Sequence, residues 1–396
     1  MDSNKLRADF PVLQSSKSIY FDSACTALKP RAVVDAESGY YSELSACAGR
    51  SHHSLARRTE EKFEASRARI ASFVGAKPEE LVFTKNTTEA LNLVIRSLDY
   101  SQRRKVVSTP LEHHSLLLPI MEQQRRGIVK MEMMGVNQAG EIPESSLSVI
   151  DSSTALVAVH HTTNTTGMRA PLEKIVKAAH DAGALVLIDA AQGVPHSRVD
   201  FRKLGADFLA FSGHKMCGPT GIGCLVGKKE AFEKLDTFIV GGETVETVSL
   251  QAVKWKSAPK RFEAGIQNYA GAIGLAAACD YLSKIGMENI ERHEKEMAGK
   301  LISAIQSIPG ATIYGSVSAP RCALASFNLK GVSAHQVALM ADSLSKIAMR
   351  SGVFCAEPGA NVLGFGKGAA RASLYLYNTE EEVRIFAETM QKIAKL

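Results

Sequence analysis

Between about residues 60 and 230, short apolar runs rich in β-branched residues alternate with longer segments of helical periodicity. This alternation is typical of a mainly parallel sheet covered by helices, because parallel neighbours need a crossover connection that is usually a helix. The runs with the length of strands are 80–84, 105–109, 128–133, 155–160, 184–189, 208–212 and 222–226. We therefore predict an α/β fold with a mainly parallel seven-stranded sheet.

Beyond residue 271 the pattern changes, which indicates a second and smaller α/β unit. A long helical stretch reaches about residue 308, and strand-like or helical runs follow at 311–314, 322–328, 334–347 and 370–377. A chain of 396 residues is also too long for one ordinary core. The domains that we expect are an N-terminal segment packed on the small domain (1–20), a large domain (21–270) and a small C-terminal domain (271–396).

Composition and charge narrow the classes of function. The chain is 45% apolar and 22% charged, with a net charge of +6 and no long run of like charges, which argues against nucleic-acid binding. It has no stretch of about 18 consecutive apolar residues for a membrane span, and it begins without a signal-peptide pattern. Its seven cysteines show no CxxC pair, so no metal site is predicted. We expect a cytoplasmic protein with small acidic ligands.

One lysine stands just beyond the tip of a predicted strand. The apolar run 208–212 ends in Ser212-Gly213-His214-Lys215. A single lysine is most often an exposed surface residue. A turn shared with Ser212 and His214, however, can desolvate the amine, lower its pKa and make it nucleophilic toward an aldehyde. Lys215 is therefore a candidate for covalent attachment of an aldehyde cofactor.

A carboxylate and an amide follow the neighbouring run, 184–189. Asp189 ends this strand and Gln192 follows it, so both are expected near Lys215 at the carboxyl edge of the sheet. A carboxylate there suits a pyridinium nitrogen, because holding that nitrogen protonated makes the ring an electron sink. A turn or helix-cap role is common for a lone acid, but it does not explain Gln192.

The run 80–84 leads into Asn86-Thr87-Thr88 and then into a predicted helix. Free backbone N–H groups, the positive helix end and two hydroxyls together form an anion site suited to a phosphate group. A simple cap, with a threonine at the N-cap and Glu89 in the first turn, explains the same residues equally well.

Cys355 differs from the other cysteines in its setting. Free cysteines are usually small buried hydrophobes, but residues 350–359 are bounded by glycine and proline and are predicted to form a loop. Exposure and the nearby Arg350 favour the thiolate, which is the nucleophilic form. We predict a catalytic role for Cys355.

Taken together, these segments resemble class V aminotransferase-like pyridoxal-phosphate enzymes, and within them the SufS and NifS type of cysteine desulfurase and selenocysteine lyase. The resemblance covers nearly the whole chain. The matching pieces are Tyr20-Phe21-Asp22-Ser23-Ala24, Asn86-Thr87-Thr88-Glu89, Glu112-His113-His114, Asn164, Asp189 with Gln192, Ser212-Gly213-His214-Lys215, Phe262-Glu263-Ala264-Gly265, Arg350-Ser351-Gly352 with Cys355, and Arg371-Ala372-Ser373.

The resemblance implies an aspartate-aminotransferase-like large domain and roles for the matching residues. Lys215 would carry pyridoxal 5'-phosphate and move protons at the substrate Cα, and His113 would stack on the ring. Asp189 would pair with the ring nitrogen and Gln192 with the phenolic oxygen. The phosphate ligands would be Thr87, Thr88, Ser212 and His214. The substrate carboxylate would lie at Asn164 and Arg371, with Arg350 near the reactive loop.

The resemblance also implies an activity and partners. L-cysteine would be converted to L-alanine, leaving a persulfide on Cys355 for a sulfur-acceptor or iron–sulfur scaffold protein, and the enzyme would be a homodimer. Three places depart from the family pattern, of which one is the stretch Arg50-Ser51-His52-His53-Ser54, which aligns only loosely. Val353-Phe354 stands where a histidine usually precedes the reactive cysteine, and Ile266 replaces a threonine that binds phosphate across the subunit boundary, leaving Gln267 as a substitute.

Two kinds of alternative stay open at this point. A selenocysteine lyase, an epimerase or an aminotransferase would use the same scaffold with less need for Cys355. A non-catalytic sulfur-carrier or assembly module would bind cofactor or partners without releasing product, since fold alone does not establish function.

Overall fold

A seven-stranded sheet lies at the centre of the larger part of the computed structural model, which describes residues 1–49 and 51–395. Its strands are β2 (Leu81–Thr84), β3 (Lys105–Ser108), β4 (Lys130–Met133), β5 (Thr154–His160), β6 (Leu185–Asp189), β7 (Phe208–Ser212) and β8 (Gly223–Gly227). The order is β2-β8-β7-β6-β5-β3-β4, and β8 runs antiparallel to both of its neighbours, whereas the pairs among β7, β6, β5, β3 and β4 are parallel. The predicted α/β fold with a mainly parallel seven-stranded sheet is confirmed.

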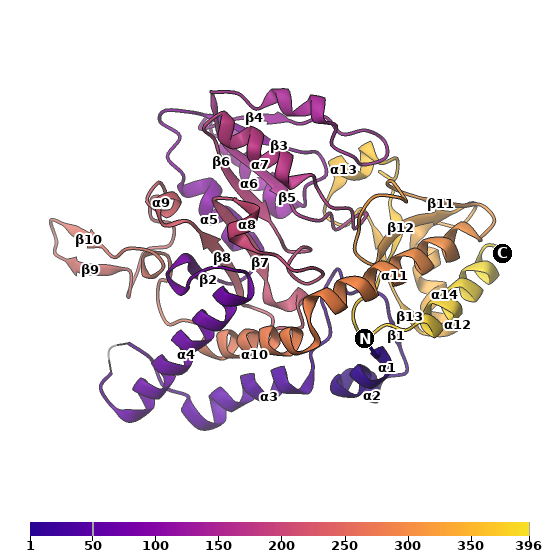
Figure 1. Cartoon of the computed structure of the whole chain (residues 1–396), viewed down its shortest axis with the longest axis horizontal. Coiled ribbons are helices and arrows are strands. Elements are labelled where there is room, and N and C mark those ends of the chain that lie inside the picture. The colour runs from indigo at the N-terminus through magenta and orange to yellow at the C-terminus, as the bar shows by residue number, and fades with distance from the viewer. Residues whose placement is uncertain (50, 396) are drawn as a thin grey trace.

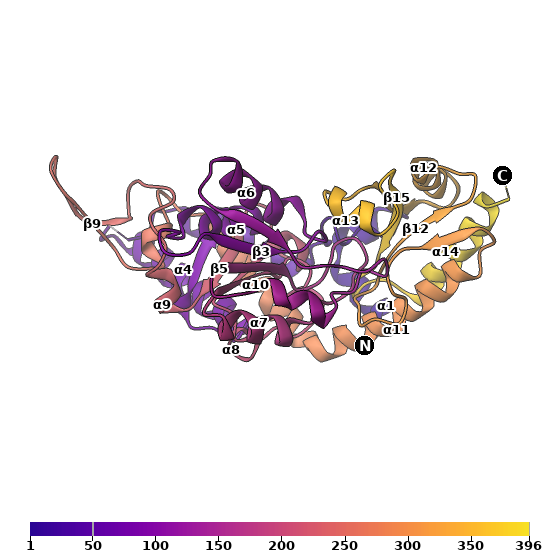
Figure 2. The ribbon, with the colours of Figure 1, turned by 90° about the horizontal axis from the view of Figure 1, so that it is seen from above.

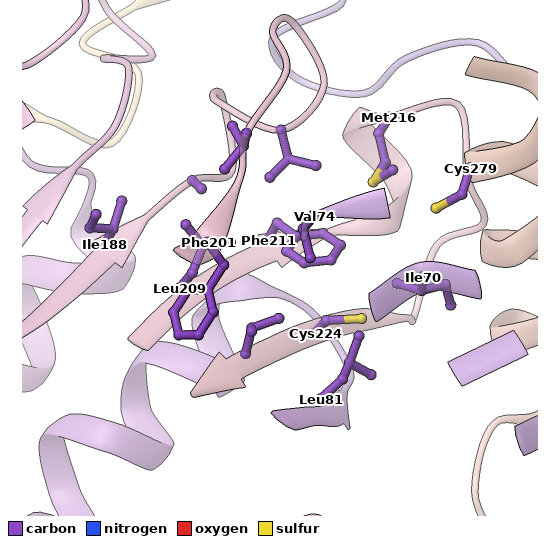
Figure 3. Close-up of a cluster of buried hydrophobic side chains, with 14 of the residues drawn as sticks. Ile70, Val74, Leu81, Ile188, Phe201, Leu209, Phe211, Met216, Cys224 and Cys279 are labelled. Carbon is purple, nitrogen blue, oxygen red and sulfur yellow. The ribbon is translucent and has the colours of Figure 1, made fainter. Parts of the chain in front are cut away.

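Helices cover both faces of this sheet because its strands are apolar on both faces (Figure 1). In β5, Leu156 and Ala158 join the core under α5 (Thr87–Ser97) and α6 (His114–Arg125). The alternate residues Val157 and Val159 join the opposite core. The helices that contribute to that core include α4 (Ser54–Phe73), α7 (Leu172–Asp181) and α10 (Tyr269–Ile285). Figure 3 shows part of it, with Leu209, Phe211 and Cys224 on neighbouring strands near Ile70 of α4.

A four-stranded antiparallel sheet forms the second unit, beside the first (Figures 1 and 2). Its order is β11 (Ala311–Ile313), β12 (Leu324–Leu329), β15 (Ala369–Ser373) and β14 (Arg350–Gly352). Its core includes residues of α11 (Met287–Gln306), α12 (Ala334–Ser345) and α14 (Glu380–Ile393). The single helical stretch predicted up to residue 308 is two helices, because Gly286, at φ 90°, separates α10 from α11.

The N-terminal segment lies against the C-terminal part of the chain. It contains α1 (Ser3–Leu6), α2 (Pro11–Ser15) and β1 (Ile19–Tyr20), and β1 pairs in parallel with β13 (Ile347–Ala348). Arg7 forms an ion pair with Glu382 of α14 at 2.7 Å. Most of α10 lies in the range predicted as the small domain, but α10 packs on α3 (Arg31–Gly39) and α4 of the large unit. The domain limits at residues 20 and 270 stay predictions.

A β-hairpin of β9 (Val245–Val248) and β10 (Val253–Trp255) projects away from the large unit (Figures 1 and 2). Its tip residue Leu250 is fully exposed. The remaining helices are α8 (Phe201–Leu204), α9 (Lys229–Phe232), α13 (Glu357–Val362) and the short turns of helix Arg7–Asp9, Tyr40–Leu44, Pro78–Glu80, Glu144–Val149, Gly213–Lys215 and Lys260–Phe262. Among the described residues, none of the helices has the length and apolarity that crossing a membrane requires.

Candidate active site

One open cavity, of about 230 Å³, is lined by residues of both sheets. It lies beyond the carboxyl ends of β5, β6 and β7 and is bordered by residues of β14 and β15. Every site residue predicted from the sequence lines it: Thr87, Thr88, His113, Asn164, Asp189, Gln192, Ser212, His214, Lys215, Arg350, Cys355 and Arg371. Parallel strands that end at one edge explain how residues far apart in sequence converge here.

Lys215 ends a single turn of 3₁₀ helix that directly follows β7. The turn is held in place because the carbonyl oxygen of His214 accepts three hydrogen bonds. They come from Ala27 N at 2.9 Å, Thr26 Oγ1 at 3.0 Å and Lys29 Nζ at 3.3 Å. Burial lowers the pKa of the Lys215 amine, against the opposing effect of the nearby Asp189 carboxylate. A lysine in this setting has an amine that is more readily neutral and nucleophilic than an exposed one.

Asp189 ends β6, one strand away from Lys215, and is only 6% exposed. Its Oδ1 accepts the backbone N–H of Ala191 at 2.9 Å. Burial raises the pKa of this carboxyl group. Gln192, two per cent exposed, donates its side-chain N–H to the carbonyl oxygen of Ala24 at 2.7 Å. A buried acid of this kind needs a cationic partner to carry its charge, and a protonated ring nitrogen supplies one.

The N-terminus of α5 borders the same cavity. Ser212 Oγ lies 2.8 Å from Thr87 N and 2.7 Å from Thr87 Oγ1, while Thr88 Oγ1 lies 2.7 Å from Ser115 Oγ. The alternative of a threonine N-cap is wrong, because Asn86 caps the helix through the N–H of Glu89 at 3.0 Å. The threonine and serine hydroxyls thus gather at a positive helix end, an arrangement that suits phosphate.

His113 caps the N-terminus of α6. Its Nδ1 accepts the N–H of Ser115 at 3.1 Å and lies 2.9 Å from Ser115 Oγ. Burial, with the positive charges of Lys215 and Arg371 nearby, lowers the pKa of His113 to about 4. The imidazole is therefore neutral near pH 7, which suits an apolar contact with an aromatic ring.

Cys355 is exposed and lies three residues beyond β14, in a strained backbone segment. Phe354 and Cys355 both have positive φ, at 57° and 55°, a conformation that non-glycine residues adopt rarely and at a cost. Two contacts with the large unit hold the segment. Asn164 Nδ2 donates to the carbonyl oxygen of Phe354 at 2.7 Å, and the N–H of His114 donates to that of Cys355 at 2.8 Å. The thiol is thereby held at the cavity.

Arg371, on β15, is 3% exposed and has both terminal nitrogens paired. Nη1 donates to the carbonyl oxygen of Asn164 at 2.9 Å, and Nη2 contacts Asp22 Oδ1 at 3.2 Å. The guanidinium carbon lies 4.7 Å from the centre of the Phe354 ring. Nε has no partner among the described residues. A buried donor without a partner at a cavity wall is suited to an anionic ligand such as a carboxylate.

Two further residues of the site received no role from the sequence. Asp22 lies between two arginines, since it also contacts Arg350 Nη1 at 3.8 Å. Arg350 Nη1 in turn donates to the thiol of Cys25, which lines the cavity, at 2.9 Å. Arg350 is therefore paired with Asp22 and Cys25. Asp22 and Cys25 follow the short strand β1 directly in the sequence. This position alone could not indicate a role, because the sequence does not show that β1 pairs with β13.

The cavity fits pyridoxal phosphate, and the class of enzyme follows from that fit. Lys215 would hold its aldehyde carbon, Asp189 its ring nitrogen, and the hydroxyls of Thr87, Thr88 and Ser212 its phosphate. The cavity therefore has an amine for the aldehyde, a carboxyl group for the ring nitrogen and hydroxyl groups for the phosphate. The fold and the site thus define a pyridoxal-phosphate enzyme.

The comparisons with known proteins agree with this. The family model of the class-V aminotransferases matches residues 19–386. This chain is 38% identical over 401 residues to a probable cysteine desulfurase of Halalkalibacterium halodurans, covering 99% of this chain and 98% of that protein. A probable cysteine desulfurase of Synechocystis is 39% identical over 398 residues, with 98% and 94% covered. The chain therefore belongs to the class-V aminotransferase family.

Solved structures also resemble this chain over its whole length. The apo structure of a cysteine desulfurase from Thermococcus onnurineus has a TM-score of 0.94 at 40% identity, covering 99% of this chain and 98% of that one. The cysteine desulfurase CsdA of Escherichia coli, in an S-sulfonic acid form, has a TM-score of 0.92 at 32% identity, covering 100% and 99%. The arrangement of the two units is thus shared with these enzymes.

Proposed function

We propose that this chain is a cysteine desulfurase that converts L-cysteine to L-alanine and takes up the sulfur on Cys355. The observation that carries the proposal is that the exposed thiol of Cys355 and the buried amine of Lys215 line one cavity. Relatives named cysteine desulfurase that match nearly the whole chain support the same activity.

The residues of the cavity divide the binding and proton-transfer tasks. Bound pyridoxal phosphate supplies an electron sink for a carbanion at the substrate Cα. The amine of Lys215, whose pKa is lowered, removes the Cα proton and later returns a proton to the product. The substrate carboxylate binds at the guanidinium group of Arg371, which lines the cavity, and the contact of Arg371 with the backbone of Asn164 orients that group.

Sulfur transfer needs a thiolate at Cys355. Its Sγ attacks the substrate sulfur, an S–S bond forms, and the Cβ–S bond breaks with its electron pair left on the substrate carbon. Protonation of that carbon and release give L-alanine, and the enzyme keeps a persulfide. The strained Phe354–Cys355 backbone and its two hydrogen bonds hold the thiol in place for this step.

Because Cys355 is exposed, its persulfide can be reached from outside. This supports transfer of the terminal sulfur to a thiol of a sulfur-acceptor or iron–sulfur scaffold protein. Transfer to a thiolate conserves electrons, since one persulfide is broken as another forms.

We further propose that the enzyme is a homodimer. Exposed apolar side chains gather on and near the projecting hairpin: Ile239, Val240, Val248, Leu250, Val253 and Ile266. Apolar groups exposed on a projecting arm are typical of a subunit contact. A second copy of the chain would cover them, and sedimentation equilibrium of the L250D variant tests this, because the added charge would shift the protein toward the monomer.

The test of the activity is incubation of the purified protein with L-cysteine, with and without a reductant, followed by measurement of alanine and sulfide. Alanine formation is expected for the wild type and is expected to be lost in C355A. C47A is the matched control, since Cys47 is also exposed but does not line the cavity.

The other outcomes identify the alternatives. Alanine formation that persists in C355A would contradict sulfur transfer to this thiol and favour a lyase. Bound cofactor without any product from cysteine or selenocysteine would favour the assembly-module alternative.

A further inference from the structure

A buried histidine–carboxylate pair lies directly behind Gln192, outside the cavity. His196 Nδ1 lies 2.7 Å from Glu294 Oε1, and His196 Nε2 lies 3.2 Å from Gln192 Oε1. The other oxygen of Glu294 accepts the N–H of Ala323 at 3.2 Å. His196 is 5% exposed and Glu294 1%. A hydrogen-bonded chain therefore connects α11 of the small unit to the wall of the cavity.

The acceptors in this hydrogen-bonded network determine which atoms of Gln192 and His196 carry the shared hydrogens. The carbonyl oxygen of Ala24 only accepts, so the side chain of Gln192 must turn its nitrogen toward it. The oxygen of the Gln192 amide then faces His196, whose Nε2 must carry a hydrogen. On the other side of the ring, Nδ1 faces Glu294 Oε1 at 2.7 Å. The amide of Gln192 cannot rotate by half a turn without losing both of its bonds.

This fixed orientation determines what Gln192 offers to a ligand. The amide nitrogen has two hydrogens, and among the described residues its hydrogen-bond acceptor is the Ala24 carbonyl. Its oxygen is taken by His196. The group left for the cavity is therefore an N–H, which pairs with an oxygen and favours the ionised form of that oxygen.

We propose that His196, held by Glu294, is a positioning residue that makes Gln192 present an N–H donor to the phenolic oxygen of the cofactor. The proposal rests on the role given above to Gln192. His196 acts through Gln192 and does not touch the cofactor. The edge-on contact of its ring with Tyr375, at 5.0 Å between ring centres, further restricts the ring.

The same residues do not form a free metal site. His196, Glu294 and Cys322 have their potential ligand atoms within 4.8 Å of one another. Both imidazole nitrogens are, however, engaged in the hydrogen bonds described above. The hydrogen-bonded chain accounts for these residues without an ion.

The experiment compares two substitutions of His196 in the holoenzyme and the apoprotein. H196N keeps an N–H near the position of Nδ1, toward Glu294, and removes the donor to Gln192. H196Q is long enough to restore that donor. The dissociation constant of pyridoxal phosphate is measured by equilibrium dialysis, and the pH midpoint of the visible absorbance band is measured by titration. Neither measurement requires turnover of cysteine.

We expect H196N to weaken cofactor binding about tenfold, the effect of one lost hydrogen bond. The pH midpoint should move upward, because the phenolic oxygen loses a donor that stabilises its negative charge. H196Q should recover most of both effects. The matched control is H180N, since His180 also pairs with a carboxylate, Asp207, at 2.9 Å but lies outside the cavity.

A double-mutant cycle with Q192A separates positioning from a general loss of stability. If His196 acts through Gln192, H196N will not weaken cofactor binding further in the Q192A background. An equal additional loss there, or wild-type affinity and midpoint in H196N, would overturn the proposal.

If H196N fails to fold, the variant Q192E provides a second test. Q192E places an oxygen where the proposal requires an N–H facing the phenolic oxygen, and its affinity for pyridoxal phosphate is measured in the same way. We expect Q192E to lose at least as much affinity as Q192A, and wild-type affinity in Q192E would equally overturn the proposal. Failure of cysteine desulfuration in the wild type would be seen separately, since it leaves cofactor binding measurable.

Discussion

The side-chain amide of Asn164 donates to the carbonyl oxygen of Phe354 at 2.7 Å, and this bond connects the large unit to the segment that carries Cys355. The residue before the reactive thiol is thus held by a residue that follows β5. Because Phe354 and Cys355 both have positive φ, the segment needs such contacts to keep its conformation.

Replacement of Asn164 by alanine should therefore slow the sulfur-transfer step. Loss of a partner for a buried carbonyl costs about 1–3 kcal/mol, so we expect kcat for alanine formation to fall about tenfold or more. The rate at which Cys355 is alkylated by iodoacetamide should change at the same time. In the control N137A, which removes an exposed amide that bonds to Glu141, both rates should be unchanged. A raised KM with normal kcat and alkylation would instead restrict Asn164 to substrate binding.

Lys215→Ala should remove covalent attachment of the cofactor. Borohydride reduction of the wild type, followed by peptide mass mapping, should place the cofactor on the peptide that contains Lys215. The variant should show no such modification. Its rate of alanine formation should fall by about 10²–10⁴-fold or more, because this is the range for loss of a proton-transfer group. K228A tests a lysine at the end of the neighbouring strand β8 that pairs with Asp207. Turnover in K215A at the rate of K228A would disprove the assignment.

The strands and the convergence of the site were predictable because their causes are local. Apolar runs of strand length specify the large sheet, and residues that follow parallel strands must meet at one edge. The antiparallel direction of β8 could not be predicted in this way, because it depends on which strands β8 pairs with and not on its own residues. Residues 350–359 were predicted to form a loop because glycine and proline bound them, yet 350–352 form the edge strand β14 through pairing with β15.

The contacts that complete the site could not be predicted for a similar reason. Asp22 reaches Arg371 across 349 positions of sequence, and Asn164 reaches Phe354 across 190. No local pattern encodes such pairs. They arise from the packing of the two units against each other, which only the structure gives.

The apoprotein should lose stability as the pH falls from about 6.5 toward 4. Burial lowers the pKa of His113 and of His214 to about 4, and that of His161 to about 3. In this pH window the unfolded chain binds more protons than the folded one, so the free energy of unfolding decreases as the pH falls and is fully recovered above the unfolded pKa.

The variant H113Q isolates one of these groups. The midpoint of urea unfolding of the apoprotein, measured at pH 5 and pH 7.5, should differ less in H113Q than in the wild type. H335Q, which replaces an exposed histidine, should leave the difference unchanged. An H113Q variant with the full wild-type difference would show that His113 is protonated equally in the folded and unfolded states.

Glu263, in the segment Phe262-Glu263-Ala264-Gly265 that the resemblance included, has a structural role that can be measured. Its two oxygens bind Arg67 at 2.7 and 2.8 Å, and Oε1 also accepts the N–H of Phe83 at 2.8 Å. Arg67 and Glu263 are 2% and 5% exposed. Glu263→Ala would leave the Arg67 charge and the Phe83 N–H buried without this partner, so we expect a loss of about 3–5 kcal/mol in the free energy of unfolding.

The exposed pair of Glu122 and Arg125, also bonded through two contacts, is the matched control. Glu122→Ala should cost less than about 1 kcal/mol, because solvent screens an exposed ion pair and hydrates each partner when it is alone. Denaturant unfolding of both variants measures the difference. Equal small losses would mean that water reaches Arg67 once the carboxylate is removed, whereas the expected large difference would show that the buried Arg67 charge and the Phe83 N–H of β2 depend on Glu263.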